Sequence, residues 1–450
     1  MTNRVAIIGG GFSGTLAAIN LARHDGPRAL LIERADSIGQ GLAYGAAAPG
    51  HVLNVRASNM SALPDEPDHF IRWLADQGIA DPAAQFAPRR LYGRYLADLL
   101  HGTAASAGDR IERRMGEVVA VERERDGALV RLADGSVERV CKVILAVGNL
   151  PPHDPPGFDA RVLPADLYAA NPWADGVADG LSDSDDVLLL GTGLTMIDMA
   201  LLLDASGFRG RIVALSRRGL LPHAHAPATP FDRIRDKPVP LGSPLVRAVR
   251  TRSAAIGWRN AVDELRPFTQ AIWAGADIAT RRRFIRHLRP WWDVHRHRLA
   301  PQVAERIAAM QAEGRLIVRS GYSRSARAEA GRLVVCWRPR GDAQVHEARF
   351  RRAVNCTGPA GDLSRCTEPL LRQLLQAGWI RPDPLHLGVD VDQGARTLDA
   401  QGRANDWLLA IGPMTRGAHW EIVAVPDIRV QAWTIARRLA NGHWVGGEGL

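Results

Sequence analysis

The sequence predicts an α/β fold with two dinucleotide-binding, Rossmann-like domains, one inserted in the other. A short apolar run leads straight into a glycine-rich turn near residue 9, and the same pattern recurs near residue 191. Each turn is followed by a helix-like segment and a second apolar run, which is the order of a βαβ unit. The chain has 450 residues, of which 46% are hydrophobic and 23% charged, so it has room for two or three such domains.

The first unit lies at the start of the chain. Residues 5–8 form a continuous apolar run, typical of a strand that is buried on both faces. Residues 15–23 are expected to form a helix, and residues 29–32 the next strand. The sequence therefore predicts a strand, glycine turn, helix and strand in immediate succession.

The turn of this unit fits the GxGxxG fingerprint. Gly9 permits a tight turn, Gly11 lets the backbone approach a pyrophosphate, and Gly14 lets the helix pack closely on the strand. Phe12 and Ser13 open the helix, whose free N–H groups and positive dipole end favour phosphate.

An acidic residue ends the second strand of this unit. Glu33 lies 19 residues after Gly14, where its carboxylate can accept hydrogen bonds from a ribose diol and repel a 2′-phosphate. We therefore expect this unit to hold FAD or NAD and not NADP, with Arg34 beside the cofactor.

The second unit has a weaker fingerprint. Gly191, Thr192 and Gly193 follow an apolar strand at residues 187–190, but Met196 stands where the third glycine belongs. A side chain at that position implies looser packing of the helix on the strand. A glycine turn in an ordinary α/β unit that binds no nucleotide is the alternative interpretation.

The strand that follows, at residues 212–215, ends with the opposite charge. Ser216, Arg217 and Arg218 replace the acid of the first unit. Because the planar fork of arginine suits phosphate, we expect NADPH here, with NADH as the other candidate. For the two arginines, a solvated charged turn is the alternative.

These two units predict the domain organisation. We expect a discontinuous FAD-binding domain made of residues 1–150 and 350–450. An NAD(P)H-binding domain would occupy residues 151–349 and include a helical insertion, rich in arginine and tryptophan, at about 221–313. Further helices are expected at 70–75, 91–100 and 428–441, and further strands at 117–132, 137–147, 315–319, 332–338 and 348–355.

Composition sets limits on partners and location. The formal net charge of +9 favours small anionic ligands, but nearly all of the 57 basic residues are arginines, a bias that we attribute to a GC-rich genome and not to nucleic-acid binding. No apolar stretch approaches the ~18 residues that a bilayer span needs, and the N-terminal apolar run is too short for a signal peptide. We expect a soluble cytoplasmic protein without nucleic-acid or membrane partners, and its oligomeric state stays open.

The cysteines argue against two further classes. They are Cys141, Cys336, Cys356 and Cys366, and no two are spaced as CxxC or CxxxxC. A disulfide reductase needs such a redox pair beside its flavin, so we reject that class. Reduced thiols are the simplest expectation.

Residues 281–298 combine arginines, histidines and tryptophans. An RNA-binding helix or a metal site at His295 and His297 would use these residue types, but neither has supporting ligands or a basic domain around it. We therefore expect no metal. An electropositive wall for an anionic ligand and a helix of packed tryptophans with solvated arginines remain equal alternatives. His223 and His225 could line the same cleft.

Several stretches together resemble one protein family. They are GQGLAYG at 39–45, HVLNV at 51–55, RRLYGRYL at 89–96, RFIRHLRPWWDVHRHR at 283–298, VNCTGP at 354–359 and IGP at 411–413. They resemble the bacterial FAD/NAD(P)-binding proteins of the YdhS type over almost the whole chain. That architecture is similar to flavin-containing and N-hydroxylating monooxygenases, and flavoprotein urate hydroxylases belong to the wider group. The resemblance implies reduction of FAD by NAD(P)H, followed by oxygen activation.

The resemblance also implies roles for cofactor-binding residues. Gly148, and Thr357 with Gly358, look like the linkers where the chain crosses between domains. Gly412 stands where many flavoproteins have a Gly-Asp pair that contacts the ribityl phosphate. Here Pro413 follows, so that contact must come from elsewhere.

Four residues are the catalytic candidates near the isoalloxazine ring. Asn54 resembles part of the loop that reaches the flavin, and Arg416, His419 and Trp420 precede a helix whose N-terminus could stabilise reduced, anionic flavin. A surface charge is the alternative for Arg416.

The leading hypothesis is an FAD-dependent NAD(P)H oxidoreductase. We expect a single-component monooxygenase that uses O2 to hydroxylate a small polar or anionic substrate, and a urate-like heterocycle is the candidate that family analogy provides. The alternatives are an NAD(P)H:flavin-linked reductase or oxidase without an oxygenated product, and a non-catalytic flavin-binding module.

Overall fold

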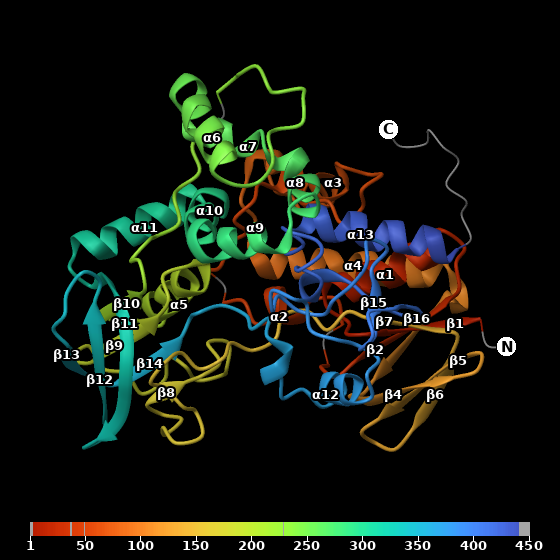
Figure 1. The fold of residues 1–450 in the computed structure, drawn as a ribbon, viewed down its shortest axis with the longest axis horizontal. Coiled ribbons are helices and arrows are strands. Elements are labelled where there is room, and N and C mark those ends of the chain that lie inside the picture. Colours follow the sequence, from red (N-terminus) through yellow and green to blue (C-terminus); the bar gives the residue numbers. More distant parts are fainter. Residues whose placement is uncertain (1–2, 37, 49, 228, 441–450) are drawn as a thin grey trace.

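Two separate sheets lie at opposite ends of the molecule in the computed structural model, which describes residues 3–36, 38–48, 50–227 and 229–440 (Figure 1). A six-stranded sheet holds both the first βαβ unit and strands from the last hundred residues, and a seven-stranded sheet holds the second unit. The predicted fold class, an α/β fold with two Rossmann-like sheets, is confirmed. The domain limits at residues 150 and 350 stay a prediction.

The six-stranded sheet has the order β15-β16-β7-β1-β2-β3. Its strands are β1 (Arg4–Ile8), β2 (Arg28–Glu33), β3 (Ile111–Met115), β7 (Lys142–Leu145), β15 (Arg396–Leu398) and β16 (Ala404–Ala410). All pair in parallel except β15, which is antiparallel at the edge. The carboxyl ends of five parallel strands therefore meet along one edge of the sheet, where ligands bind in such folds.

Both faces of this sheet are covered, which explains the continuous apolar runs of its strands. Val5 and Ile7 of β1 belong to a core on one face, shared with α1 (Phe12–Arg23), α4 (Arg89–Ser106) and α13 (Val425–Leu439). Ala6 and Ile8 point into a second core with α12 (Pro369–Gln376) and a small antiparallel sheet. Figure 1 shows the three long helices above the sheet and α12 below it.

The small sheet corrects one prediction. Its strands are β4 (Val118–Glu124), β5 (Gly127–Leu132) and β6 (Val137–Val140). The run at 137–147, expected to be a single strand, is divided at Cys141, because β6 pairs in this antiparallel sheet and β7 in the parallel one. The apolar run continues across Cys141 without a breaker, so the sequence holds no sign of the change of sheet.

The seven-stranded sheet has the order β13-β12-β11-β10-β9-β14-β8. Its strands are β8 (Tyr168–Ala169), β9 (Asp186–Leu190), β10 (Arg211–Ser216), β11 (Leu316–Glu329), β12 (Arg332–Pro339), β13 (His346–Phe350) and β14 (Arg352–Asn355). Strands β8 to β11 and β14 pair in parallel, with α5 (Leu194–Ala205) and α11 (Pro301–Ala312) packed on one face. Strand β11 is much longer than the predicted 315–319, because its exposed outer half pairs with β12 as a hairpin.

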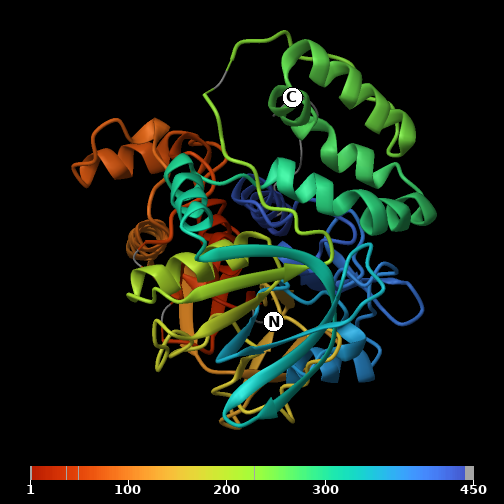
Figure 2. The same cartoon turned by 90° about the vertical axis from the view of Figure 1, so that its left-hand side faces the viewer.

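A group of helices stands between the two sheets, above both (Figures 1 and 2). It contains α6 (Ser243–Ile256), α7 (Trp258–Asp263), α8 (Thr269–Ala274), α9 (Ile278–Arg283), a π-helical turn η5 (Phe284–Leu288) and α10 (Arg289–Arg296). These helices lie between β10 and β11 in the chain, within the segment 221–313 that was predicted to contain a helical insertion. No helix in the described ranges is long and apolar enough to cross a bilayer.

The six-stranded sheet with the elements packed on it forms the first lobe, and the seven-stranded sheet with its helices forms the second. Short elements complete the first lobe: α2 (Gly41–Gly45), α3 (His69–Asp76) and the 3-10 turns η1 (Ala57–Asn59), η2 (Pro82–Ala84), η3 (Gly108–Arg110), η6 (Leu363–Arg365) and η7 (Gly412–Met414). The 3-10 turn η4 (Arg266–Phe268) lies between α7 and α8 in the helical group. Helix α13 begins at Val425, three residues before the predicted start at 428, with Pro426 in its first turn. Proline suits that position because its missing N–H would have no intrahelical partner there.

Candidate cofactor sites and the segment between them

The first glycine turn is shaped by close backbone contacts. Gly9 has a φ of +106°, and a Cβ there would lie 2.4 Å from the carbonyl oxygen of Ala146. A Cβ at Gly14 would lie 1.8 Å from the carbonyl oxygen of Gly9. Both positions exclude a side chain because of the protein's own backbone.

Gly11 is different, because the protein leaves room beside it. The nearest atom to a Cβ there would be the Cα of Gly41 at 3.5 Å, an ordinary contact. Gly11 is also the N-cap of α1 and no side chain caps the helix, so the first-turn N–H groups are available to a ligand. The open backbone and the uncapped helix end fit a dinucleotide pyrophosphate.

Residues predicted to surround this turn are brought together. Ser13 is 5% exposed, and a Cβ at Gly412 would lie 2.3 Å from its Oγ, so the end of β16 meets the start of α1. Phe12 packs against Tyr44 and Tyr92, both with ring centroids 6.2 Å away.

Glu33 is fixed beside the turn by backbone N–H groups. Its Oε2 accepts from Gly10 at 2.6 Å and its Oε1 from Ala35 at 3.0 Å. Each carboxylate oxygen keeps a lone pair for a ribose hydroxyl. Arg34, by contrast, donates to Glu368 at 2.9 Å, so its charge is already paired.

The second glycine turn repeats the backbone geometry of the first. Gly191 has a φ of +116°, and a Cβ there would lie 2.3 Å from the carbonyl oxygen of Cys356. Gly193 caps α5 without a side-chain hydrogen bond, and no atom lies within 4 Å of the position of its Cβ. Met196 is fully buried and stands where the first unit has Gly14, so the second helix accommodates a side chain at a position where the first excludes one.

The polar groups at this turn differ from those at the first. The Oγ1 of Thr192 lies 2.8 Å from the Oγ of Ser216, which also accepts from the Gly219 N–H at 3.0 Å. Arg217 is exposed and Arg218 half-buried, and neither forms a hydrogen bond or an ion pair within the described part of the chain. The two guanidinium groups are therefore available to an anion.

Each glycine turn contacts one of the two predicted linkers. Ala146 and Cys356, whose carbonyls face Gly9 and Gly191, are the first residues of the linker segments that contain Gly148 and Gly358. The linkers meet four residues later, where Leu150 and Ala360 form an antiparallel bridge. Each linker thus runs four residues from the carbonyl that faces a glycine turn to this bridge. Four fully extended residues span about 14 Å at most, so each of these carbonyls lies within that distance of the bridge. Thr357 donates its hydroxyl to Asn355 at 2.7 Å.

A salt bridge and a histidine join the two lobes. Arg89 of α4 donates to both carboxylate oxygens of Asp198 on α5, at 2.8 and 3.0 Å, and His51 lies 2.8 Å from the Asp198 carbonyl. Burial lowers the pKa of His51 from its ordinary value of 6.5. The carbonyl of Asn54 lies 2.9 Å from Nε2 of His225, which fixes the predicted flavin loop to the second lobe.

Trp420 lies in an aromatic cluster between the C-terminal segment and the helical group. It is 3% exposed and stacks on Trp273, with ring centroids 4.6 Å apart, while Phe284 meets its edge at 5.3 Å. Trp273 also donates its indole N–H to the Gly417 carbonyl at 2.8 Å. Arg416 packs on this cluster, with its guanidinium carbon 4.7 Å from the Trp420 ring centroid.

Arg416 and His419 have polar atoms without partners. Burial lowers the pKa of Arg416 to about 10, and the repulsion of Arg289 adds to this effect. Arg416 forms no ion pair within the described residues, and its buried Nε has no hydrogen-bond partner. The Nε2 of His419 is likewise buried and unpartnered, and burial lowers its pKa. A cation this poorly solvated and without a carboxylate partner favours an incoming anion.

Glu421, which no sequence motif singles out, is fully buried with a φ of +69°. Trp292 donates its indole N–H to it at 2.8 Å, and Arg296 and His297 lie 3.4 and 3.8 Å from its oxygens. Burial would raise the pKa of Glu421, but His297, Arg296 and Trp292 together lower it. The only sequence signal is an acid between two apolar residues, and its partners lie more than 120 positions away.

Several basic side chains of residues 281–298 have partners within the protein. Arg296 and His297 face Glu421, and Arg281 donates to the carbonyls of Trp273 and Ala274 at 2.9 and 3.0 Å. In the described ranges, no group of three or more His, Cys, Asp or Glu side chains could hold a metal ion.

A family model matches the first part of the chain. Residues 6–150 match the family described as FAD-NAD(P)-binding, so the chain contains an FAD-NAD(P)-binding domain. No curated protein matches the chain.

Three solved structures are similar to the chain over almost its full length. Ornithine hydroxylase PvdA from Pseudomonas aeruginosa, in its reduced form, is 16% identical with a TM-score of 0.66, and the match covers 98% of this chain and 99% of that one. L-lysine 6-monooxygenase from Pseudomonas syringae is 16% identical with a TM-score of 0.67 and the same coverage. Thioredoxin reductase from Lactococcus lactis is 13% identical, with a TM-score of 0.55 and again 98% and 99% coverage. The chain thus has the fold that these hydroxylases and this reductase share.

Proposed function

We propose that the chain is an FAD-dependent NAD(P)H oxidoreductase of the YdhS type that acts as a single-component monooxygenase. FAD would bind at Gly9, Gly11, Gly14 and Glu33, and NADPH at the second turn with Arg217 and Arg218. The observation that carries this proposal is that each glycine turn contacts its own linker and the linkers meet at one bridge. Two cofactors held in this way would lie close enough to exchange electrons.

The chemistry would be divided between cofactor and protein. Bound FAD would supply hydride acceptance and oxygen chemistry. Glu33 would hold the ribose, the uncapped starts of α1 and α5 would hold the pyrophosphates, and the cluster around Trp420 would exclude water from one side of the site. Arg217 and Arg218 would favour the 2′-phosphate of NADPH over NADH by charge.

Arg416 supports a small anionic substrate. Its guanidinium has no carboxylate partner and is held over the Trp420 ring, so a planar anion could bind it through paired hydrogen bonds. A urate-like heterocycle has that shape and charge. The ornithine, lysine and cadaverine enzymes among the similar structures are named for cationic substrates, so they support the fold and the class of chemistry but not this substrate.

An Arg416→Gln variant tests this assignment. We expect the KM for urate in NADPH-dependent oxygen consumption to rise at least tenfold, because a charge-assisted pair is lost, while anaerobic flavin reduction by NADPH stays unchanged. Arg125→Gln, which alters an exposed arginine of the β4–β5 hairpin, is the matched control. An equal KM in both variants would contradict the role of Arg416.

A reductase or oxidase without an oxygenated product is the second candidate, and the likeness to thioredoxin reductase favours it. A disulfide reductase in particular does not fit, because all four cysteines are free. Burial also raises the pKa of Cys356 far above its ordinary value, which disfavours a thiolate. Urate-dependent oxygen consumption without hydrogen peroxide release would favour the monooxygenase, and stoichiometric peroxide would favour the oxidase. A chain that binds FAD but no NAD(P)H would be a binding module.

A further inference from the structure

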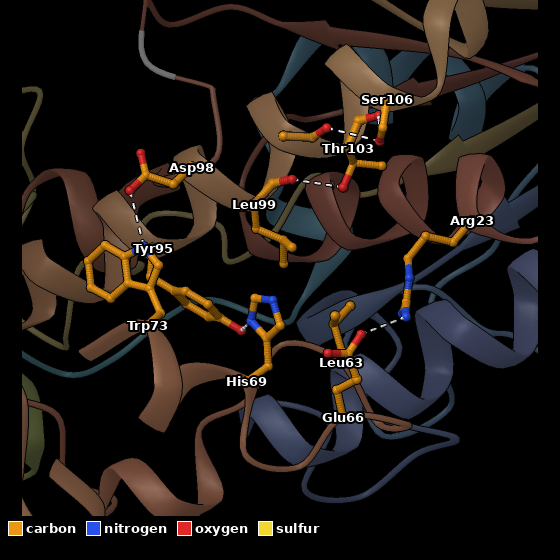
Figure 3. Close-up of a pocket in the computed structure, with 11 residues that line it drawn as sticks. Arg23, Leu63, Glu66, His69, Trp73, Tyr95, Asp98, Leu99, Thr103 and Ser106 are labelled. Carbon is orange, nitrogen blue, oxygen red and sulfur yellow. Dashed lines mark hydrogen bonds and ion pairs between the residues drawn. The ribbon is translucent and has the colours of Figure 1, made fainter. Parts of the chain in front are cut away.

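A cavity of about 400 Å³ opens in the first lobe, away from the glycine turn. It lies between the C-terminal half of α1, helix α3 and helix α4 (Figure 3). Arg23, the last residue of α1, lines it, and α1 begins at Phe12. At 1.5 Å per residue the cavity is roughly 16 Å from the turn, so it is separate from the proposed FAD site.

One wall of the cavity holds the half-buried ring of Trp73. The fully buried ring of Tyr95 supports it, with centroids 5.6 Å apart and planes inclined by 59°. Leu63 and Leu99 continue this apolar lining toward Arg23, as Figure 3 shows. The volume and the apolar lining suit a single flat ring of drug-like size or smaller.

His69 provides a polar group in the middle of the lining (Figure 3). The oxygen of Tyr95 accepts from the Ala62 N–H at 3.1 Å and lies 2.9 Å from Nδ1 of His69. Burial lowers the pKa of His69, which favours the neutral form of the ring. His69 therefore adds a polar ring to the lining without favouring a positive charge there.

The cation in the lining is already neutralised. Arg23 donates to both carboxylate oxygens of Asp65, at 3.0 and 3.1 Å, and to Glu66 at 3.0 Å. The other oxygen of Glu66 accepts from Arg72 at 2.6 Å. These four side chains together carry no net charge.

Asp98 is the remaining charged group, at the rim of the cavity. One of its oxygens accepts from the indole N–H of Trp73 at 3.2 Å, and the other has no partner in the described part of the chain. The cavity thus combines the exposed carboxylate of Asp98 with the half-buried ring of Trp73. A carboxylate beside an indole ring attracts an organic cation through charge and through cation–π contact.

We propose that this cavity is a second small-molecule site, which binds a small aromatic amine in its protonated form. The ring lies against Trp73, and the ammonium group lies at Asp98. The site is independent of the proposed oxidoreductase function, since none of its residues takes part in either glycine turn.

The test is calorimetric titration of the full-length protein, with its flavin bound, by three indoles of the same shape and different charge. They are tryptamine (cationic), tryptophol (neutral) and indole-3-acetate (anionic). We expect one tryptamine per chain, bound at least tenfold more tightly than tryptophol, and no saturable binding of indole-3-acetate.

Variants locate the site. Asp98→Asn should remove the preference for tryptamine over tryptophol, Trp73→Leu should weaken both, and Asp76→Asn, an exposed acid at the end of α3, should change neither. Equal binding of the three indoles, no saturable binding, or an unchanged preference in Asp98→Asn would each overturn the proposal. Loss of tryptamine binding in Arg217→Ala with Arg218→Ala would place the ligand in the second glycine turn and overturn it as well.

Discussion

The two glycine turns share a backbone and differ in the groups at the end of the next strand. At the first turn, the backbone N–H of Gly10 donates to Glu33, and at the second, the side chain of Thr192 contacts Ser216. A Cβ at Gly9 or at Gly191 would lie 2.4 or 2.3 Å, respectively, from the carbonyl oxygen of a linker residue. In the function proposed above, the common geometry would hold a common ligand part, the pyrophosphate, and the difference in charge would match different ribose substituents.

The glycines of the two turns fall into two groups, according to what surrounds the position of a Cβ. Gly9, Gly14 and Gly191 have backbone atoms where a side chain would be, so the fold requires them. A Cβ at Gly11 would make only an ordinary contact with Gly41, at 3.5 Å, and one at Gly193 would meet no atom within 4 Å, so the fold itself does not require these two glycines. This separation can be tested without any assay of turnover.

The largest effect is expected at Gly14. A Gly14→Ala variant would place its Cβ 1.8 Å from the Gly9 carbonyl, so the helix must move, at a cost of about 3 kcal/mol in unfolding free energy. The protein should lose its flavin. Flavin-to-protein absorbance ratios and denaturant unfolding measure both consequences.

Gly11→Ala and Gly193→Ala are the matched controls. Both should leave the unfolding free energy of the ligand-free chain within about 0.5 kcal/mol of wild type, because the new methyl group makes at most an ordinary van der Waals contact. Gly11→Ala should lower the flavin content, and Gly193→Ala should keep the flavin and weaken NADPH binding. Equal destabilisation by Gly11→Ala and Gly14→Ala would break the distinction.

The next effect concerns nucleotide choice. Replacing Arg217 and Arg218 together by Ala should raise the Kd for NADPH by about 10- to 100-fold and change that for NADH by less than about threefold, because only the 2′-phosphate loses its partners. The Kd values come from the concentration dependence of anaerobic flavin reduction. A parallel loss for both nucleotides would mean that the two arginines do not read the 2′-phosphate.

The smallest effect is a pH dependence at the contact between the lobes. Burial lowers the pKa of His51, so below about pH 6.5 the unfolded chain binds more protons than the folded one. The unfolding free energy therefore decreases as the pH is lowered. The unfolding free energy should drop between pH 7 and pH 5, and His51→Gln should reduce that drop by about 1 kcal/mol. An unchanged drop in the variant would assign the pH dependence to other histidines.

Local patterns predicted the turns well, because a strand, a glycine turn and a helix are adjacent in the chain. Gly9, Gly14 and Gly191 stand where the fingerprint indicates, with the expected close contacts. The partners of Glu421 and the isolation of Arg416 could not be predicted, since they depend on packing between segments more than 100 residues apart. The division at Cys141 escaped for a similar reason, because two strands of one apolar run pair with different sheets.

The central claim is that two cofactors exchange electrons between these two turns, and anaerobic titration of the purified flavoprotein with NADPH tests it most directly. The visible absorbance of oxidised flavin should bleach with one equivalent of NADPH, and bleaching should need a higher concentration of NADH. Bound FAD that neither nucleotide bleaches would contradict the claim.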